Sequence, residues 1–322
     1  MTQRYGDGRR ILVTGGAGFV GSHLVDALLA RGAEVVAVDN FVTGSKDNVA
    51  HLAEEDRFTL VDADVSRELP VEGRFDAVLH FASPASPTDF ERFPLEIMHV
   101  HAEGTFACLD LAERDGARFV FAGTSEVYGD PQVHPQPESY WGNVNPIGPR
   151  SVYDEAKRFG EAATMAYRRS RGVDTAILRI FNTYGPRMRP DDGRAIPTFF
   201  SQALRGEPIT VHGSGSQTRS ICYVDDLVAG VLAMLDSDHA GPVNLGTEHE
   251  VSMRELAETI ATLAGTGSEV VYVDRPTDDP EVRRPDLTLA RELLGFDPVV
   301  GPAEGLRRTL AYFAERLGVR LP

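Results

Sequence analysis

Residues 11–21 have the sequence Ile-Leu-Val-Thr-Gly-Gly-Ala-Gly-Phe-Val-Gly, an apolar run that leads into glycines spaced GxxGxxG. Gly15 permits the tight turn that follows a strand. Gly18 lets the backbone approach a pyrophosphate at the N-terminus of the next helix, and Gly21 allows that helix to pack closely on the strand. The pattern predicts a strand–turn–helix unit that binds a dinucleotide. Because a turn without a ligand can have the same glycine spacing, the flanking residues must decide.

The ends of the next two predicted strands favour NAD as that dinucleotide. Asp39 follows Gly21 by eighteen residues, where a carboxylate binds the adenosine ribose hydroxyls and repels the 2′-phosphate of NADP. Asp64 and Val65 close the third strand, and they either contact the adenine edge or form an ordinary strand-end turn. We expect NAD as the cofactor, with contacts from Gly15, Gly18, Phe19, Val20, Gly21, Asp39, Asn40, Phe41, Asp64, Val65, Ala82, Tyr153 and Lys157.

Short β-branched runs alternate with longer helical patterns through the first half of the chain. This alternation predicts an α/β fold, a Rossmann-type doubly wound parallel sheet with helices on both faces. Strands are expected at residues 11–13, 34–38, 58–61, 77–81, 119–121 and 174–180, and helices at 19–30, 97–113 and 151–169. We expect residues 1–181 to form mainly the NAD-binding domain and residues 182–322 mainly a smaller C-terminal substrate-binding lobe, with segments crossing between them.

Composition excludes several classes of protein. The 322 residues include 32 Lys plus Arg against 48 Asp plus Glu, a formal net charge of −16 that repels nucleic acids and anionic membranes. The two cysteines, Cys108 and Cys222, cannot form a disulfide framework, and no CxxC pair suggests zinc. Residues 1–10 lack the apolar segment of a signal peptide, and no stretch approaches the roughly twenty apolar residues of a membrane span. We expect a soluble cytoplasmic protein without a metal.

Two segments carry the candidate catalytic residues. Tyr153 and Lys157 form a YxxxK pair one helical turn apart, so their side chains share a face. The lysine ammonium favours the phenolate and lowers the pKa of the tyrosine, which can then remove a hydroxyl proton. An earlier strand delivers Thr124, Ser125 and Glu126 at its C-terminal end, where ligands bind in open α/β sheets. The threonine offers a hydroxyl to the reacting oxygen, and the glutamate can protonate or deprotonate a neighbouring carbon.

With several longer motifs added, the chain resembles the extended short-chain dehydrogenase/reductase family, and within it the UDP-glucuronate decarboxylases. The resemblance covers nearly the whole chain. Its most specific segments are ASPASP at residues 82–87 and TSEVYG at residues 124–129. Further matches are YWG (140–142), YDEAKR (153–158), IFNTYGPRM (180–188), DDGR (191–194), GSGSQTR (213–219) and RRPD (283–286).

The resemblance implies a defined reaction. Tyr153 would be the base, with Lys157 and Thr124 as its partners, while NAD oxidises C4 of UDP-glucuronate to a ketone. The resulting β-keto acid loses CO2, the counterpart of Glu126 assists protonation at C5, and hydride returns to C4. NAD is regenerated in each turnover and stays bound. Candidate substrate contacts are Asn182, Arg194, Arg219, Arg283 and His99.

The chain departs from the family in one helix. His99 and His101 stand where the family usually has lysine and asparagine, and the lysine position contributes to the family's substrate site. Residues two apart on a helix do not share a face, so we expect no metal site at this pair. The resemblance also implies a homodimer formed through the helices at 97–113 and 151–169.

Other readings of the sequence stay open. A UDP-glucuronate 4-epimerase would share the C4 oxidation and keep the carboxylate, although simple epimerases usually have a small residue in place of Glu126. A nucleotide-sugar 4,6-dehydratase would usually have Asp-Glu where this chain has Ser125-Glu126. A non-catalytic NAD-sensing protein would lack Tyr153 or Lys157. Nothing in the sequence distinguishes uridine from thymidine in the substrate.

Overall fold

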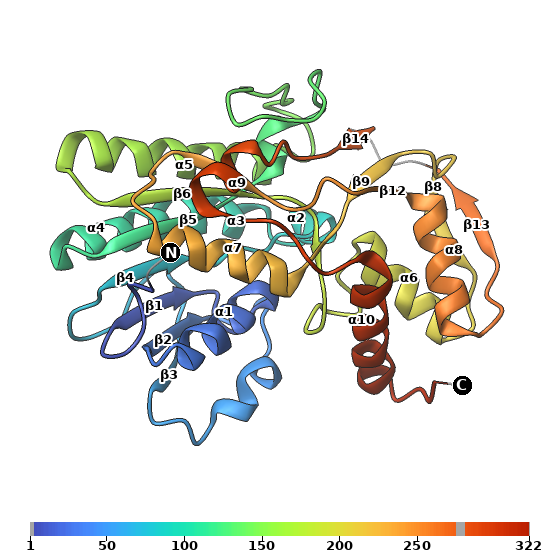
Figure 1. Cartoon of the computed structure of the whole chain (residues 1–322), viewed down its shortest axis with the longest axis horizontal. Helices are drawn as coiled ribbons and strands as arrows, with labels where there is room; N and C mark the ends of the chain where they lie inside the picture. Colours follow the sequence, from blue (N-terminus) through green and yellow to red (C-terminus); the bar gives the residue numbers. More distant parts are fainter. Residues whose placement is uncertain (1–2, 275–280, 322) are drawn as a thin grey trace.

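The computed structural model describes residues 3–274 and 281–321. Its centre is a seven-stranded sheet in the order β11-β6-β5-β4-β1-β2-β3, in which neighbouring strands are parallel (Figure 1). The strands are β1 (Arg10–Thr14), β2 (Glu34–Asp39), β3 (Phe58–Asp62), β4 (Ala77–His80), β5 (Arg118–Thr124), β6 (Thr175–Ile180) and β11 (Pro242–Leu245). The central strands β4 and β5 are buried along their whole length, as strands covered on both faces must be. The predicted Rossmann-type doubly wound sheet is confirmed.

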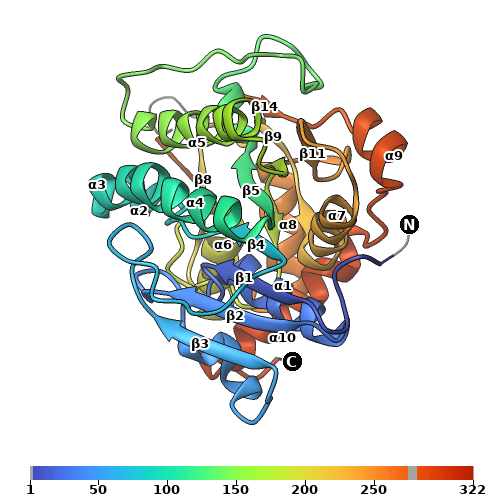
Figure 2. The same cartoon turned by 90° about the vertical axis from the view of Figure 1, so that its left-hand side faces the viewer.

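Helices cover both faces of this sheet (Figure 2). On one face lie α1 (Phe19–Ala30) and α7 (Val224–Asp236), and on the other lie α4 (Thr105–Asp115) and α5 (Ser151–Arg171). The alternation of side chains along β1 shows the division: Ile11 and Val13 pack in the core with α1, whereas Leu12 packs in the core with α4 and α5. The predicted bounds of α1 agree with the structure.

The predicted helix at residues 97–113 is not one regular helix. It consists of α3 (Pro94–His99), a wider π-helical turn η2 (Val100–Gly104) and α4. The short α2 (Pro87–Arg92) precedes these elements. A π-helical turn inserts one extra residue per turn and often marks a functional site. Here it turns His101 into the interior while His99 stays on the surface.

A small lobe packs beside the carboxyl ends of the strands. Its helices are α6 (Ala195–Leu204), α8 (Met253–Ala264) and α10 (Pro302–Leu317), and its strands are β8 (Ile209–His212), β9 (Thr218–Ser220), β12 (Glu250–Ser252), β13 (Val270–Val273) and β14 (Val282–Arg283). β8 pairs with β13, and β9 lies between β12 and β14.

The remaining elements are η1 (Lys46–Leu52), η3 (Ser125–Tyr128), β7 (Thr183–Tyr184), β10 (Cys222–Tyr223) and α9 (Thr288–Leu294).

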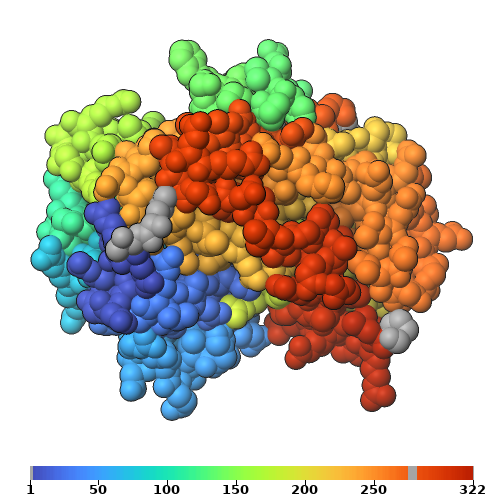
Figure 3. Space-filling view, in the orientation of Figure 1, coloured from blue at the N-terminus to red at the C-terminus, as the bar shows by residue number. Residues whose placement is uncertain are grey.

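Segments beyond residue 181 cross back into the large domain. β11 pairs with β6 at the edge of the main sheet, and α7 packs against α1. In the space-filling view, the last part of the chain, in red, runs from the large domain across to the small lobe (Figure 3). Within residues 3–274 and 281–321, no helix is both long and apolar enough to span a bilayer.

The contact between α5 and β5 can be tested at Gly160. A Cβ on this residue would lie 2.2 Å from Cζ of Phe121. We expect Gly160→Ala to lower the free energy of unfolding by about 1–3 kcal/mol, because the helix must move away from the sheet. Urea denaturation would measure the loss. Ala162→Ser, on the exposed side of the same helix, is the control. Equal midpoints for the two variants would contradict this packing.

Candidate active site

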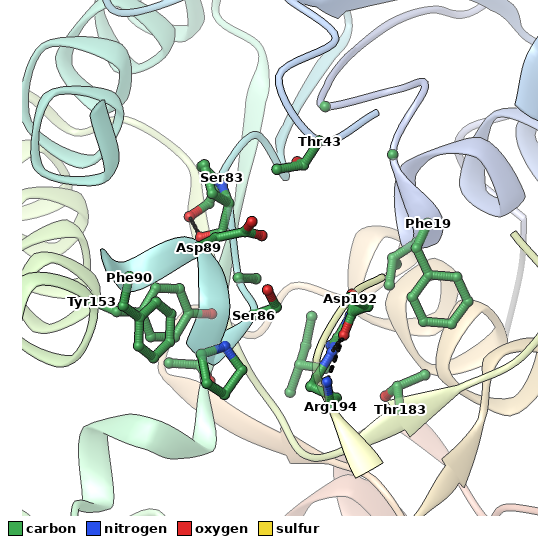
Figure 4. Close-up of a pocket in the computed structure, with 18 of the residues that line it drawn as sticks. Phe19, Thr43, Ser83, Ser86, Asp89, Phe90, Tyr153, Thr183, Asp192 and Arg194 are labelled. Atoms are coloured by element: carbon green, nitrogen blue, oxygen red, sulfur yellow. Dashed lines mark hydrogen bonds and ion pairs between the residues drawn. The ribbon is translucent and has the colours of Figure 1, made fainter. Parts of the chain in front are cut away.

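A cavity of about 450 Å³ lies between the carboxyl ends of the strands and the small lobe. Its walls come from the loop after β1, the loop after β4, the end of β5, the start of α5 and the small lobe (Figure 4). This edge is where open α/β sheets bind ligands. Of the residues predicted for the site, all line this cavity except Phe41 and His99.

The glycine loop packs so closely on its neighbours that there is room for backbone atoms but not for side chains. Gly15 has a φ of +69°, and a Cβ there would lie 2.9 Å from the backbone of Ala82. A Cβ on Gly21 would lie 2.0 Å from the carbonyl oxygen of Gly15. The helix α1 therefore starts directly at the cavity wall, and its first turn contains no acidic side chain. This arrangement fits the pyrophosphate of NAD, since the positive end of the helix dipole faces the cavity.

Asp39 is fixed beside this loop by backbone hydrogen bonds. Its Oδ2 accepts from the N–H of Ala17 at 3.0 Å, and its Oδ1 accepts from the N–H of Phe41 at 2.8 Å. Burial raises the pKa of Asp39, although the backbone donors oppose the shift. Asp64 forms the strand-end turn by accepting from Ser66, and it also lines the cavity. The strand-end turn predicted for Asp64 is therefore present, and its contact with adenine stays a prediction.

Two predicted site residues point away from the cavity. Phe41 has a positive φ of 56°, and its ring lies under the ammonium of Lys46 at 4.6 Å, so its side chain is not a cavity wall. His99 is exposed on α3, with Nδ1 3.2 Å from a carboxylate oxygen of Glu103. The helix turns its side chain to solvent and away from the cavity wall, and its contact with the substrate stays a prediction. The described residues contain no group of three or more metal-ligating side chains.

Tyr153 and Lys157 lie next to each other on the buried face of α5. Lys157 Nζ donates to the carbonyl oxygen of Ala122 at 2.7 Å and lies 5.6 Å from the centre of the Tyr153 ring. Thr124, at the end of β5, hydrogen-bonds to the tyrosine side chain. The structure thus brings together the three groups that the sequence predicts for proton transfer.

Burial dominates the pKa values of this pair. Removal from water raises the pKa of Tyr153, and the negative charge of Glu126 raises it further, while Thr124 acts in the opposite direction. Burial also lowers the pKa of Lys157 to about 7. The structure does not show the predicted lowering of the tyrosine pKa, because the low-polarity surroundings disfavour the charged form of both groups.

Two aromatic contacts around Tyr153 were not predicted from the sequence. The ring of Phe90, from α2, stacks on the tyrosine ring with centres 4.8 Å apart and an angle of 17° between the planes (Figure 4). His101 lies edge-on at 6.3 Å, and its Nε2 is 2.9 Å from Oγ of Ser83. These neighbours fix the orientation of the phenol. No short-range pattern could have found Phe90, since the contact depends on how α2 folds over α5.

Glu126 is held between two arginines. Its Oε2 accepts from Nη2 of Arg150 at 2.6 Å, and its Oε1 pairs with Nη1 of Arg283. Arg283 is 2% exposed and also donates to the carbonyl oxygen of Gly129 at 2.7 Å. Burial alone would raise the pKa of Glu126, but the two guanidinium charges outweigh it and hold that pKa well below the usual range. The glutamate is therefore a fixed carboxylate, and it is poorly suited to the predicted role of an acid that protonates carbon.

The other predicted polar residues surround this centre. Nη2 of Arg194 donates to Oδ2 of Asp192 at 2.8 Å, and both side chains face the cavity in Figure 4. Ser125 is buried, and Asn182 and Arg219 line the cavity. Nη1 of Arg219 donates to the carbonyl oxygen of Thr218 at 2.9 Å. The arginines predicted for a charged substrate are therefore gathered at one site.

Comparison with known proteins agrees with this geometry. The model of the NAD dependent epimerase/dehydratase family matches residues 11–246. The chain is 50% identical over 311 residues to UDP-glucuronic acid decarboxylase 1 of Xenopus tropicalis, covering 97% of this chain and 73% of that protein. It is also 50% identical to UDP-glucuronic acid decarboxylase 5 of Arabidopsis thaliana, covering 96% of this chain and 91% of that protein.

Solved structures show the same fold. UDP-glucuronic acid 4-epimerase from Bacillus cereus, in complex with UDP-glucuronic acid and NAD, superimposes with a TM-score of 0.84 at 28% identity, covering 95% of this chain and 99% of that chain. A dTDP-glucose 4,6-dehydratase from Streptomyces venezuelae with NAD bound gives a TM-score of 0.85 at 30% identity, covering 96% and 98%.

The ion pairs of Glu126 should make stability depend on pH in a definite direction. The pKa of Glu126 is lower in the folded protein than in the unfolded chain, so its ion pairs add stability. This stability is complete above pH 4.5, the ordinary pKa of glutamate, and is lost as the pH falls toward the pKa of the folded state. We expect Glu126→Gln to lower the free energy of unfolding by about 3 kcal/mol at neutral pH, and the difference from the parent to shrink in acid. Urea denaturation over a pH series measures it, with the exposed Glu103→Gln as control. A difference that does not change with pH would contradict this assignment.

Proposed function

The chain belongs to the NAD-dependent epimerase/dehydratase family, and we propose that it converts UDP-glucuronate into UDP-xylose and CO2. The relatives named UDP-glucuronic acid decarboxylases, which share half of its residues over nearly its whole length, support this substrate. The observation that carries the proposal is Arg283, a buried arginine in the cavity wall whose guanidinium already holds a carboxylate, that of Glu126.

The glycine loop, Asp39 and Lys157 are the residues that would hold NAD. When bound, NAD supplies the hydride acceptor for C4 of the sugar and the donor that later restores it. The backbone of the loop would take the pyrophosphate, and the Asp39 carboxylate would take the ribose hydroxyls. These assignments rest on the cavity lining and on the lack of room for side chains in the loop.

Tyr153 would remove the proton of the C4 hydroxyl, with Thr124 hydrogen-bonded to the same oxygen. The ketone at C4 makes the substrate a β-keto acid. The bond between C5 and the carboxyl carbon then breaks to release CO2, and its electron pair delocalises onto the C4 oxygen. C5 takes up one proton that comes from solvent, and Tyr153 returns its proton to the C4 oxygen. The net reaction consumes one proton for each CO2 released.

Proton NMR in D2O tests this function. The purified protein is incubated with UDP-glucuronate, and we expect UDP-xylose that carries deuterium at C5, because the proton added there comes from solvent. Formation of UDP-galacturonate without CO2 would instead show a 4-epimerase, the activity named for the Bacillus cereus structure. Absence of any product would reject UDP-glucuronate as the substrate. The same assay with Tyr153→Phe should show at least a thousandfold loss, roughly the value of a general base, while bound NAD is retained.

We also propose a homodimer formed by the surface of α3, α4 and α5. Leu95, Met98, Phe106 and Phe159 are large apolar side chains exposed on these helices. The rings of Phe106 and Phe159 meet edge to face at 5.7 Å, and the three helices lie together in Figure 2. A cluster of this kind on a water-soluble surface is typical of a protein interface.

The charge substitution Phe159→Glu should convert the dimer into a monomer, because it places a carboxylate among apolar side chains. Sedimentation equilibrium measures the mass of both proteins. Val299→Glu, which alters an exposed apolar residue elsewhere on the chain, should remain dimeric. A parent protein that sediments as a monomer would refute the interface.

We also propose a cytoplasmic location, on the basis of the two cysteines. Cys108 and Cys222 are both buried free thiols. Burial raises the pKa of Cys108 to about 12, which makes it unreactive. Buried free thiols fit a reducing compartment.

A further inference from the structure

We propose that residues 186–192 (the strap) close over bound NAD, and that the ion pair between Arg189 and Asp89 keeps the strap closed. The inference goes beyond the proposed function, which assigns no residue to retention of the cofactor. It rests on the placement of NAD at the glycine loop, and it is independent of which sugar nucleotide the protein converts.

The beginning of the strap is anchored to α1. Nε2 of His23 donates to the carbonyl oxygen of Pro186 at 3.1 Å, and Nη2 of Arg187 lies 2.7 Å from Oδ2 of Asp26. Both partners belong to α1, the helix whose first turn borders the proposed pyrophosphate site. Arg187 has a φ of +69°, a backbone conformation that costs free energy in a residue with a side chain and persists only where surrounding contacts impose it. The contacts with α1 therefore fix the turn with which the strap begins.

The end of the strap is anchored to α2. Nη2 of Arg189 donates to both carboxylate oxygens of Asp89, at 3.0 and 2.8 Å. Oγ1 of Thr88 donates to the carbonyl oxygen of Asp192 at 2.9 Å. Directly after the strap, a Cβ on Gly193 would lie 2.3 Å from Cγ2 of Thr88. The strap and α2 are therefore in close contact, although Arg189 and Asp89 are 100 residues apart in the chain.

The two anchors belong to the two elements that continue from the walls of the proposed NAD site. α1 follows the glycine loop after β1, α2 follows the loop after β4, and both loops line the cavity. In the view of Figure 4, Asp192 of the strap lies between Phe19 of α1 and Asp89 of α2. The strap therefore spans from one wall to the other, and NAD held between the walls would be enclosed by it.

The anchor on α2 is the one that borders the cavity itself. Among the described residues, the cavity lining includes Arg189, Asp89 and Asp192 of this anchor, but neither His23 nor Asp26 of the anchor on α1. Release of the strap from α2 would therefore open the cavity directly.

The ion pair of this anchor is placed to make such opening rare. Asp89 is 1% exposed, and separation from Arg189 would leave its buried carboxylate without a cation. Loss of the partner is strongly unfavourable for a buried charge, whereas exposed ion pairs contribute little. In the proposed reaction the same cofactor is reduced and reoxidised within one turnover. Loss of the reduced cofactor before the hydride returns would leave the sugar oxidised, so retention serves the reaction.

The test measures release of NAD from the holoenzyme without any sugar nucleotide. The protein is loaded with radiolabelled NAD and freed of unbound label by gel filtration. Excess unlabelled NAD is then added, and the label that stays on the protein is followed with time. The variants are Arg189→Gln, Asp89→Asn and the double variant that carries both substitutions. Circular dichroism and urea midpoints are recorded for each, so that loss of stability can be separated from loss of closure.

The matched control is Arg31→Gln. Arg31 pairs with Asp236 at 2.9 Å, and its side chain is 23% exposed, as is that of Arg189. The two carboxylate partners are also buried to a similar extent. Among the described residues that line the cavity, neither Arg31 nor Asp236 is included. The control therefore removes an equivalent ion pair at a distance from the strap.

We expect Arg189→Gln and Asp89→Asn each to release NAD about tenfold to a hundredfold faster than the parent, the value of one charged hydrogen-bonded pair. A variant that keeps its circular dichroism spectrum and loses its NAD during gel filtration counts as faster release. The double variant should release NAD no faster than the single ones, because both substitutions break the same pair. Arg31→Gln should release NAD at the rate of the parent.

Three results would overturn the inference. These are release at the parent rate by Arg189→Gln, equally fast release by Arg31→Gln, and single effects that multiply in the double variant. Because no sugar nucleotide is present, the result is separate from the proposed function. A protein that fails to convert UDP-glucuronate can still show the effect of the strap, and unchanged release of NAD would leave the proposed reaction standing.

Discussion

The close approach of α1 to the sheet is the constraint on which the site depends. A Cβ on Gly21 would lie 2.0 Å from the carbonyl oxygen of Gly15, and a Cβ on Gly15 would meet the backbone of Ala82. Three backbone segments therefore meet without side chains between them. Because these segments approach so closely, both the N-terminus of α1 and the loop after β4 line the cavity. A side chain at either position would push apart two of the walls that define the site.

Buried charge has two different uses in this fold. Arg118, at the start of β5, pairs with Asp174 and donates to the carbonyl oxygens of Met234 and His239, which ties the strand to the end of α7. Arg283 is equally buried but lies at the other end of the sheet, in the cavity wall. Burial of a charge costs free energy in both places, and hydrogen bonds offset it in both. Only the charge at the carboxyl ends of the strands can meet a ligand, so location distinguishes the two uses.

Features that depend on local sequence pattern could be predicted, whereas contacts between segments distant in the sequence could not. The bounds of α1 and the order of alternating elements follow from glycine spacing and from hydrophobic runs, which act over a few residues. The π-helical turn at η2 could not be predicted, because it depends on packing of α3 and α4 against α5. The position of the Phe41 ring could not be predicted, because its positive φ turns the ring toward Lys46. The rise in the Tyr153 pKa and the pairing of Arg150 with Glu126 arise from burial and from contacts between elements, which spacing along the chain does not report.

The edge strand β11 limits when the central sheet can complete its folding during synthesis. β6 has hydrogen-bonding partners on both sides only when residues 242–245 have joined it, and its Ala176, Ile177 and Leu178 are buried in the finished sheet. A nascent chain that has emerged only through β6 would expose an unpaired apolar edge, which favours association with other chains. The nucleotide-binding half therefore cannot complete its own sheet until residues 242–245 have been translated. Fragments cut between β6 and β11 would lack a protected edge.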